Sequence, residues 1–184
     1  MGIGLGLGLM KIILCMVLSV DGKSTKHNLS DQSWASSEDQ EHLSKLISEN
    51  NLILMGGKTY ELAKSHMKLS EGKLRVVVTH SLEKYSEDKV EGQLEFVSGS
   101  ISEVVSNLEN RGFKKMLLLS GENLNKEFFE NNLVDEIYLT VEPKVFGSGK
   151  GMVSESEMDV NLQLMEIMKL NESGTILLHY KVIK

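Results

Sequence analysis

Short apolar segments alternate with amphipathic segments along most of the chain. Continuous apolar runs are typical of strands buried on both faces of a sheet, whereas apolar residues spaced three and four apart are typical of the covering helices. The expected strands span residues 11–20, 52–55, 74–78, 94–97, 116–119 and 134–141. The expected helices span 36–49, 59–66, 101–111 and a segment carrying Leu124, Phe128 and Phe129. This order predicts an α/β domain with a mainly parallel, twisted sheet flanked by helices.

The end of the chain has a different pattern, with two strand-like segments in direct succession. Residues 161–170 and 175–183 are separated only by the polar turn Asn171-Glu-Ser-Gly174. This arrangement predicts an antiparallel C-terminal hairpin at the edge of the sheet. Its apolar residues suit pairing with a second subunit in a homodimer, and edge packing within one chain is the alternative. These residues are Leu162, Leu164, Ile167, Ile176 and Leu178.

The length and composition predict one domain. A chain of 184 residues with 41% hydrophobic residues can bury one sizeable core, which we expect to span residues 10–184. Residues 1–9 alternate glycine with apolar residues and are expected to be an extension or tag-like segment. A signal peptide with its apolar core at residues 12–18 is the alternative. The net charge of -6 and the lack of a basic cluster argue against nucleic acid as a partner.

Cysteine and histidine usage restricts the chemistry further. Cys15 is the only cysteine of the sequence and lies in an apolar run, so we expect an inert, buried thiol and a cytoplasmic location. The five histidines are scattered, and none pairs with Cys15 or with another histidine at ligand spacing. We therefore expect no metal site, no membrane partner and a small molecule as the substrate.

Polar turns follow the expected parallel strands. In such sheets, ligands bind beyond the carboxyl ends of the strands. The turns that begin at Ser19, Gly56, Thr79, Ser98 and Ser120 all lie at these ends. We therefore expect these segments to converge on one crevice.

The turn after residues 52–55 has the composition of an anion site. Gly56 and Gly57 let the backbone turn tightly and approach a ligand. Lys58 and Thr59 place a cation and a hydroxyl beside the exposed N–H groups of the next helix. The turn matches neither the P-loop pattern nor the dinucleotide fingerprint, so an ordinary strand-to-helix turn is the alternative.

Several motifs, taken in order, resemble the reductase domain of riboflavin biosynthesis, a family that shares the dihydrofolate reductase fold. The resemblance covers Lys11 to about Gly151 and depends on the order and spacing of the motifs together. The motifs are Ser19-Val-Asp-Gly-Lys23, Ser33-Trp34 with Ser37-Glu-Asp39, Ile53-Leu-Met-Gly-Gly-Lys-Thr-Tyr-Glu61, Leu119-Ser-Gly121 and Val134-Asp-Glu-Ile-Tyr-Leu-Thr-Val-Glu-Pro-Lys-Val-Phe-Gly147. It implies a dihydrofolate reductase-like fold.

The resemblance also implies an activity. The enzyme would use NADPH and transfer hydride from the nicotinamide to an electrophilic carbon of a pyrimidine-like or pterin-like substrate. The leading substrate is 5-amino-6-(5-phosphoribosylamino)uracil of riboflavin biosynthesis, and dihydrofolate is the alternative. A nucleotide-binding module that kept the fold without turnover is a third possibility, from a different functional class.

Cofactor contacts follow from the same resemblance, although each segment taken singly is also ordinary turn chemistry. The turn that would hold the cofactor phosphates contains Gly56, Gly57, Lys58 and Thr59. The loop near the adenosine 2′-phosphate would contain Thr79, His80 and Ser81, and Ser98 would lie on the adenine side. The second glycine turn, under the pyrophosphate, and the start of its helix would be Ser120, Gly121, Glu122 and Asn123.

The resemblance assigns the chemistry to two other segments. Asp39 lies five residues after Trp34, as the catalytic acid and tryptophan do in dihydrofolate reductases. A carboxyl in a partly apolar cleft would have a raised pKa and could protonate a substrate ring, whereas an acid favouring the helix dipole is the alternative. Asp21 is the second catalytic candidate. The expected substrate contacts are Ser19, Asp21, Lys23 and Trp34, and a plain turn at Asp21-Gly22 is the alternative.

The chain also departs from the riboflavin-pathway pattern. Gln40 and Ile47 stand where those reductases carry arginines, and this loss would weaken binding of a ribosyl phosphate. Ser120 replaces the first glycine of the late pair, and we expect serine to tolerate an unusual backbone there less well.

Overall fold

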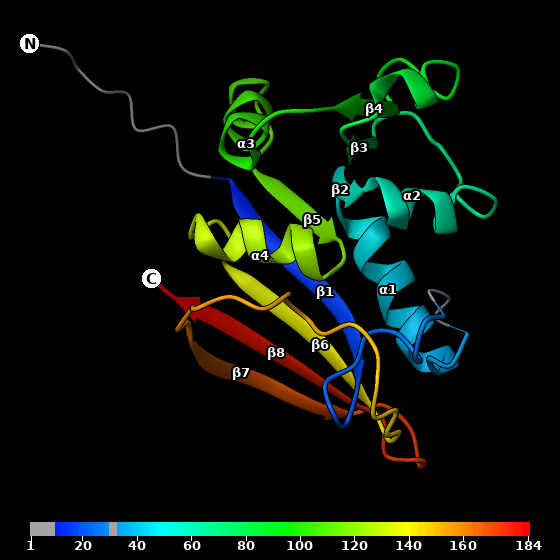
Figure 1. Ribbon diagram of the computed structural model, residues 1–184, viewed down its shortest axis with the longest axis vertical. Helices are drawn as coiled ribbons and strands as arrows, with labels where there is room; N and C mark the ends of the chain where they lie inside the picture. Colours follow the sequence, from blue (N-terminus) through cyan, green and yellow to red (C-terminus); the bar gives the residue numbers. More distant parts are fainter. Residues whose placement is uncertain (1–9, 30–32) are drawn as a thin grey trace, which may run out of the picture.

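The computed structural model describes residues 10–29 and 33–184, so the extension expected at residues 1–9 lies outside the described residues. Its centre is an eight-stranded sheet with the order β4-β3-β2-β5-β1-β6-β8-β7 (Figure 1). The pairs among the first six strands in this order are parallel, and β8 and β7 are added antiparallel. The predicted mixed sheet with an antiparallel C-terminal hairpin is confirmed.

The parallel strands match the apolar runs of the sequence. Their bounds are β1 Lys11–Ser19, β2 Leu52–Gly56, β3 Leu74–Val78, β4 Leu94–Val97, β5 Lys115–Leu119 and β6 Glu136–Glu142. The apolar runs of β1, β2 and β5 are buried on both faces because these strands lie inside the sheet and helices cover both sides. β6 starts two residues later than the sequence predicts. Asp135 precedes it, and the carboxylate of Asp135 accepts a hydrogen bond from the Ile12 amide of β1 at 2.7 Å.

The C-terminal hairpin consists of β7 Asn161–Lys169 and β8 Ile176–Ile183. β8 pairs with β6, and β7 forms the edge of the sheet with a register shift between Leu164 and Glu166. Every residue of β7 is exposed, whereas β8 keeps Leu177 and Val182 buried. The hairpin therefore extends the sheet beyond its helical cover.

Helices cover the two faces of the sheet in pairs. α1 Ser37–Glu49 and α2 Gly57–Ala63 pack on one face, and α3 Ile101–Asn110 and α4 Glu122–Glu130 pack on the other (Figure 1). A short 3₁₀ helix, η1 Leu82–Tyr85, follows β3. One core lies under α3 and α4 around Phe128, and the other lies under α1 and α2 around Tyr60.

The helix starts differ in how their first N–H groups are bonded. Ser36 caps α1 by accepting from the Asp39 amide, and Ser100 forms a capping box with Glu103 at the start of α3. α2 and α4 follow glycine N-caps, Gly56 and Gly121, which make no side-chain cap. The backbone donors at the latter two starts are therefore not taken up by a capping side chain.

The described part of the chain contains no helix with the length and hydropathy that a membrane crossing requires. Among the same residues there is no group of three or more His, Cys, Asp or Glu side chains placed to hold a metal ion.

Candidate functional site

The topology places the expected crevice at the carboxyl end of β5. β5 leads into α4 on one face, while its neighbours β2 and β1 lead toward α2 and α1 on the opposite face. Chains that leave adjacent parallel strands for opposite faces open a gap between them, and this is where open α/β sheets bind ligands. The turns after β1, β2 and β5 border this gap.

The structure brings the two glycine turns together. A Cβ atom added at Gly56 would lie 3.6 Å from Cδ2 of Leu124, a residue of α4 on the other side of the crevice. A Cβ at Gly57 would lie 3.5 Å from the Thr79 hydroxyl and from the Tyr85 hydroxyl, whereas one at Gly121 would meet nothing within 4 Å. The turns after β2, β3 and β5 are therefore neighbours, as the sequence predicts.

None of the glycines of these turns has an unusual dihedral angle, and only Gly121 leaves open space. Gly56 has φ -85° and Gly121 has φ -94°, values open to any residue. Ser120 is not among the residues with positive φ, so the expectation that serine would be strained at this position is wrong. At Gly121, the missing side chain leaves open space at the start of α4.

The expected phosphate and 2′-phosphate segments are accessible. Lys58 is exposed on the first turn of α2, a turn that carries no acidic residue, and Thr59 beside it is half-buried. His80 and Ser81 are exposed after β3, and the Ser81 amide donates to the Thr79 hydroxyl at 3.1 Å. This region can therefore accept a negatively charged group without burying a competing carboxylate.

Ser98 is more peripheral than the other turn residues. It is exposed after β4, the strand at the outer edge of the sheet, and β3 and β2 lie between β4 and β5. A contact with the adenine side stays a prediction.

The side chains around the second glycine turn are engaged in internal bonds. The Ser120 hydroxyl bonds to Oδ1 of the fully buried Asn125, whose Nδ2 donates to the Met152 carbonyl at 2.7 Å. The Glu122 carboxylate accepts from the Gly151 amide at 3.1 Å, whereas Asn123 is exposed. Ser120 and Glu122 thus hold the loop around residues 151–154 against the start of α4, and the backbone at Gly121 remains open.

Asp39 lies at the same end of the sheet and is 7% exposed, with its amide bonded to the Ser36 hydroxyl at 3.3 Å. Burial raises the pKa of the Asp39 carboxyl; the Thr140 hydroxyl opposes this rise, and the negative charge of Glu142 adds to it. A buried carboxyl with a raised pKa can hold a proton and donate it to a ligand. The bland alternative, a solvated first-turn acid, does not fit this burial.

Thr140 and Glu142 were not predicted from the sequence as site residues. Both lie on β6, at 0% and 2% exposure, on the face that packs against the start of α1. A signal was available, because Glu136, Tyr138, Thr140 and Glu142 occupy every second position of the strand. A row of polar side chains on one face of an interior strand indicates a site or a buried network.

Asp21 lies in the loop after β1 and binds protein groups. Its Oδ1 accepts from the Ser19 hydroxyl at 2.6 Å and from the Phe146 amide at 3.1 Å, and its Oδ2 accepts from the Gly147 amide at 2.7 Å. The Ser19 hydroxyl, followed by the Phe146 amide, lowers the pKa of Asp21 to about 2. Asp21 therefore stays ionised at neutral pH and joins the loops after β1 and β6, a role that differs from proton donation. Its catalytic role stays a prediction that this geometry does not favour.

The two joined loops also contain the remaining expected substrate contacts. The Ser19 hydroxyl accepts from the Lys23 amide at 3.0 Å, and the Trp34 ring meets Phe146 edge-on at 5.0 Å between centroids. A polar hollow of about 290 Å³ opens between the loops, lined by Thr25, His27, Asn28, Ser148, Gly149 and Lys150. Substrate contacts by Ser19, Lys23 and Trp34 stay predictions.

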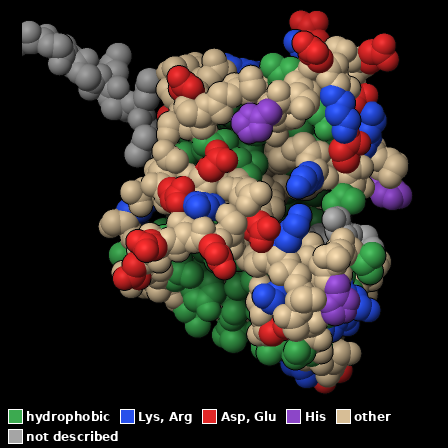
Figure 2. Space-filling view, viewed as in Figure 1, with side chains coloured by type: hydrophobic (Ala, Val, Ile, Leu, Met, Phe, Trp, Pro, Cys, Tyr) green, Lys and Arg blue, Asp and Glu red, His purple; other side chains and the backbone are tan. Residues whose placement is uncertain are grey.

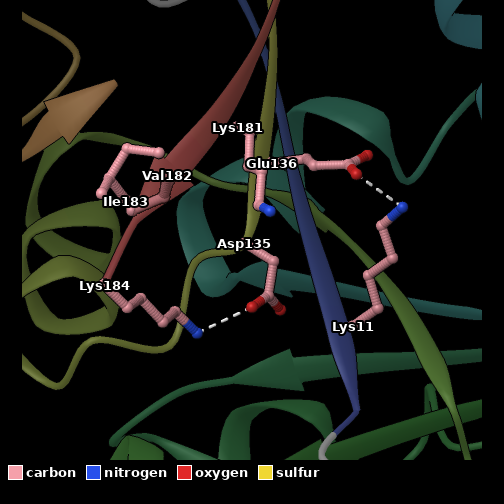
Figure 3. Close-up of a pocket in the computed structure, with 7 residues that line it drawn as sticks. All are labelled: Lys11, Asp135, Glu136, Lys181, Val182, Ile183 and Lys184. Atoms are coloured by element: carbon pink, nitrogen blue, oxygen red, sulfur yellow. Dashed lines mark hydrogen bonds and ion pairs between the residues drawn. The ribbon is translucent and has the colours of Figure 1, made fainter. Parts of the chain in front are cut away.

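A larger hollow, of about 500 Å³, lies at the opposite end of the strands (Figure 3). It is crossed by the ion pairs Lys11–Glu136 at 2.6 Å and Lys184–Asp135 at 2.7 Å. β1 and β6 begin here, so this hollow is far along the strands from the glycine turns. We therefore assign the candidate site to the crevice at the carboxyl ends.

Cys15 lies on β1 behind α1. Burial, assisted by the Asp39 charge, raises the pKa of its thiol to about 12. A thiol that stays protonated is a poor nucleophile, as expected from its position in an apolar run.

The model of the RibD C-terminal domain family matches residues 10–176. The chain belongs to the RibD C-terminal domain family. The match extends over β1 to β7, the glycine turns and the segment around Asp39, and it confirms the resemblance seen in the sequence motifs.

Individual relatives of this RibD C-terminal domain are distant. The chain is 25% identical over 178 residues to YyaP, an uncharacterized protein of Bacillus subtilis, covering 92% of this chain and 94% of YyaP. A solved diaminohydroxyphosphoribosylaminopyrimidine deaminase/5-amino-6-(5-phosphoribosylamino)uracil reductase from Thermotoga maritima matches with TM-score 0.73 and 15% identity, over 95% of this chain and 57% of that one. A dihydrofolate reductase from Enterococcus faecalis, solved with NADP(H), matches with TM-score 0.66 and 16% identity, over 95% and 97%. The two structures show that the fold is dihydrofolate reductase-like.

Proposed function

We propose that the protein is an NADPH-dependent reductase that acts on a pyrimidine-like substrate, with 5-amino-6-(5-phosphoribosylamino)uracil as the leading candidate. The observation that carries the proposal is the buried Asp39 at the same end of the sheet as the two adjoining glycine turns. Family membership and the T. maritima structure, whose name includes this reductase, support it.

The residues of the crevice fit a dinucleotide cofactor. Gly121 presents bare backbone at the start of α4, Gly56 lets the turn after β2 approach Leu124 of that helix, and Lys58 provides an exposed cation on α2. Thr79, His80 and Ser81 offer hydroxyls and an imidazole for the 2′-phosphate that distinguishes NADPH from NADH. When bound, NADPH would supply a hydride to an electrophilic carbon of the substrate.

Asp39 is assigned the proton that accompanies hydride transfer. Burial raises the pKa of the carboxyl and so favours its protonated form, which would donate its proton to a ring or imine nitrogen of the substrate. Trp34 and Phe146 form an aromatic wall in the adjacent loops. Asp21 is assigned to holding these loops together.

Dihydrofolate remains the second candidate because Asp39 has the environment of an acid that protonates a pterin ring. Gln40 is exposed on α1 and Ile47 is half-buried there, so neither position supplies the arginine that would bind a ribosyl phosphate. The absence of these arginines disfavours the ribosyl phosphate, so the two substrates are compared by experiment.

The test follows NADPH in two steps. Binding is measured first, by fluorescence at micromolar protein, and the loss of NADPH absorbance is then followed with the aminopyrimidine ribosyl phosphate and with dihydrofolate. The proposal predicts binding and consumption with the pyrimidine. Consumption only with dihydrofolate would select the alternative substrate. Binding without consumption of either would favour a nucleotide-binding module, and no binding would refute the proposal.

The proposal includes a homodimer formed through the hairpin. Figure 2 shows hydrophobic side chains gathered over β7 and β8, below α4. Leu164 and Ile167 of β7 are 50% and 59% exposed, and an edge strand offers unpaired N–H and C=O groups to a second copy.

Light scattering tests the assembly. We expect a dimer for the natural chain and a monomer for Ile167→Lys, while Leu62→Lys, at an exposed leucine of α2, should remain a dimer. A monomeric natural chain at high concentration would remove this part of the proposal. A cytoplasmic location also belongs to the proposal, and the buried, protonated thiol of Cys15 is consistent with it.

A further inference from the structure

Glu142 is a buried carboxylate that connects three parts of the molecule. It ends β6 and is 2% exposed. Its Oε1 accepts from the Ser36 amide at 2.7 Å, and its Oε2 accepts from the Thr175 hydroxyl at 2.7 Å. Both carboxylate oxygens are therefore hydrogen-bonded, which offsets the cost of burying the polar group.

The contact with Ser36 fixes the start of the helix that carries Asp39. Ser36 is the N-cap of α1, and its hydroxyl accepts from the Asp39 amide at 3.3 Å. Glu142 thus holds the backbone of the capping residue while the side chain of that residue holds Asp39. A shift of this contact would move the Asp39 carboxyl relative to the crevice.

Glu142 also acts on Asp39 through its charge. Two groups of β6 face Asp39: the Thr140 hydroxyl and the Glu142 carboxylate. Cys15 of β1 also faces it, and this thiol is neutral because its pKa is raised to about 12. On α1 itself, Glu38 is adjacent in sequence, but its carboxylate is directed to Asn171 at 3.2 Å. Among these groups, Glu142 is the charged one that disfavours ionisation of Asp39.

We propose that Glu142 is a positioning residue that fixes the first turn of α1 and keeps the Asp39 carboxyl in its protonated, proton-donating form. This inference rests on the proposed function, because it assigns Glu142 a role through the acid of that reaction. Glu142 would not transfer a proton itself. It makes the proton on Asp39 harder to lose, so that the proton is present when the substrate binds.

The same carboxylate ties the acid to the C-terminal hairpin. Thr175, which donates to Glu142, follows the turn between β7 and β8, and its hydroxyl accepts from Asn171 Nδ2 at 3.0 Å. The first turn of α1 and the hairpin turn are therefore fixed by one set of hydrogen bonds.

The test measures the ionisation of Asp39 directly, without relying on activity. Carboxyl carbons are labelled with ¹³C, the Asp39 signal is identified by its loss in Asp39→Asn, and its titration is compared in the natural chain, Glu142→Gln and Glu38→Gln. Glu142→Gln removes the buried charge with little change of shape, and Glu38→Gln removes the same charge from the preceding residue of the helix. Circular dichroism checks that each variant is folded.

We expect Glu142→Gln to lower the pKa of Asp39 by about one unit, a roughly tenfold loss of proton affinity. Glu38→Gln should move it by less than about 0.3 units, because the Glu38 carboxylate is only half-buried, is bonded to Asn171 and is screened by solvent. If Glu142→Gln does not fold, Glu142→Asp serves instead: the side chain is one methylene shorter, which draws the charge away from Asp39 and should lower the pKa of Asp39 by a smaller amount in the same direction. An unchanged pKa in the variant measured, or equal shifts from both glutamates, would overturn the proposal.

Activity then separates this inference from the proposed function. With the reductase assay, Glu142→Gln should shift the pH profile of kcat toward acid by the same unit, with little change in the KM for NADPH. A shifted pKa in a protein that consumes no NADPH would retain the role of Glu142 and refute the reductase. Turnover with an unshifted pKa would retain the reductase and refute the role of Glu142.

Discussion

Lys58 offers the sharpest single perturbation of the expected cofactor site. It is exposed on the first turn of α2, directly after Gly56 and Gly57, in a turn without acidic residues. In the part of the chain that the structure describes, no ion pair involves its ammonium group, so removing the side chain breaks no internal contact of that kind. Lys58→Ala should therefore affect ligand binding and leave stability nearly unchanged.

The size of the expected effect on NADPH binding follows from the exposure of Lys58. Hydrogen bonds to charged groups contribute about 1.5–3 kcal/mol, and screening by solvent at an exposed lysine favours the lower end. A loss of about 1.4 kcal/mol is a tenfold change in affinity. We expect the KM for NADPH to rise about tenfold in Lys58→Ala, with kcat reduced less than about twofold, because the phosphates are bound equally in the ground state and the transition state.

Lys64→Ala is the matched control for this experiment. Lys64 ends the same helix, and its ammonium group pairs with Asp88 at 2.7 Å, away from the glycine turn. Steady-state NADPH oxidation and fluorescence titration should show a normal KM for Lys64→Ala. Added salt should weaken NADPH binding more in the natural chain than in Lys58→Ala. An unchanged KM in Lys58→Ala, or the same rise in both variants, would refute the phosphate site at this turn.

Three further predictions concern Asp39, Asp21 and Arg75. The pKa of Asp39 is raised in the folded state, so the contribution of Asp39 to stability is lost as pH rises through that pKa. In urea unfolding, Asp39→Asn should therefore be more stable than the natural chain at pH 8 but not at pH 4. The variant should also lose reductase activity. The pKa of Asp21 is lowered to about 2, so its contribution is present above about pH 4 and lost as pH falls toward 2; Asp21→Asn should remove that acid sensitivity and speed hydrogen exchange at the Gly147 amide about tenfold. Arg75 is 6% exposed, and its NH1 nitrogen has no hydrogen-bond partner among the described residues. Because an unpaired buried charge is costly, Arg75→Met should raise the free energy of unfolding by about 1–3 kcal/mol. A lower melting temperature would contradict this.

The fold follows from the sequence because local signals agree with the tertiary structure. The apolar runs at β1, β2 and β5 occur where strands are buried on both faces, and Ser36 marks the start of α1 through its cap. The polar turn between β7 and β8 marks the hairpin equally clearly. These features depend on neighbours in the sequence, so they can be predicted from it.

The site was less predictable because it depends on side chains that meet only in the folded protein. The burial of Asp39 results from its position beside Thr140 on β6, a strand distant in sequence. Asp21 has the sequence of a substrate-facing turn, yet its partners are the amides of Phe146 and Gly147, more than a hundred residues away. Neither partnership has a signal within its own segment, although the alternating polar residues of β6 indicated that one face of this strand was unusual.

The proposed reaction combines hydride transfer from a bound NADPH with proton donation by Asp39. Both steps are tested by measuring hydride transfer directly in the natural chain and in Asp39→Asn. Protein in excess is mixed with NADPH deuterated at the transferred position and with the aminopyrimidine ribosyl phosphate, and the product is weighed by mass spectrometry in a single turnover. We expect the natural chain to form a product that gains one deuterium, and Asp39→Asn to form it at least about a hundredfold more slowly. A product without deuterium, or equal rates in the two proteins, would contradict it.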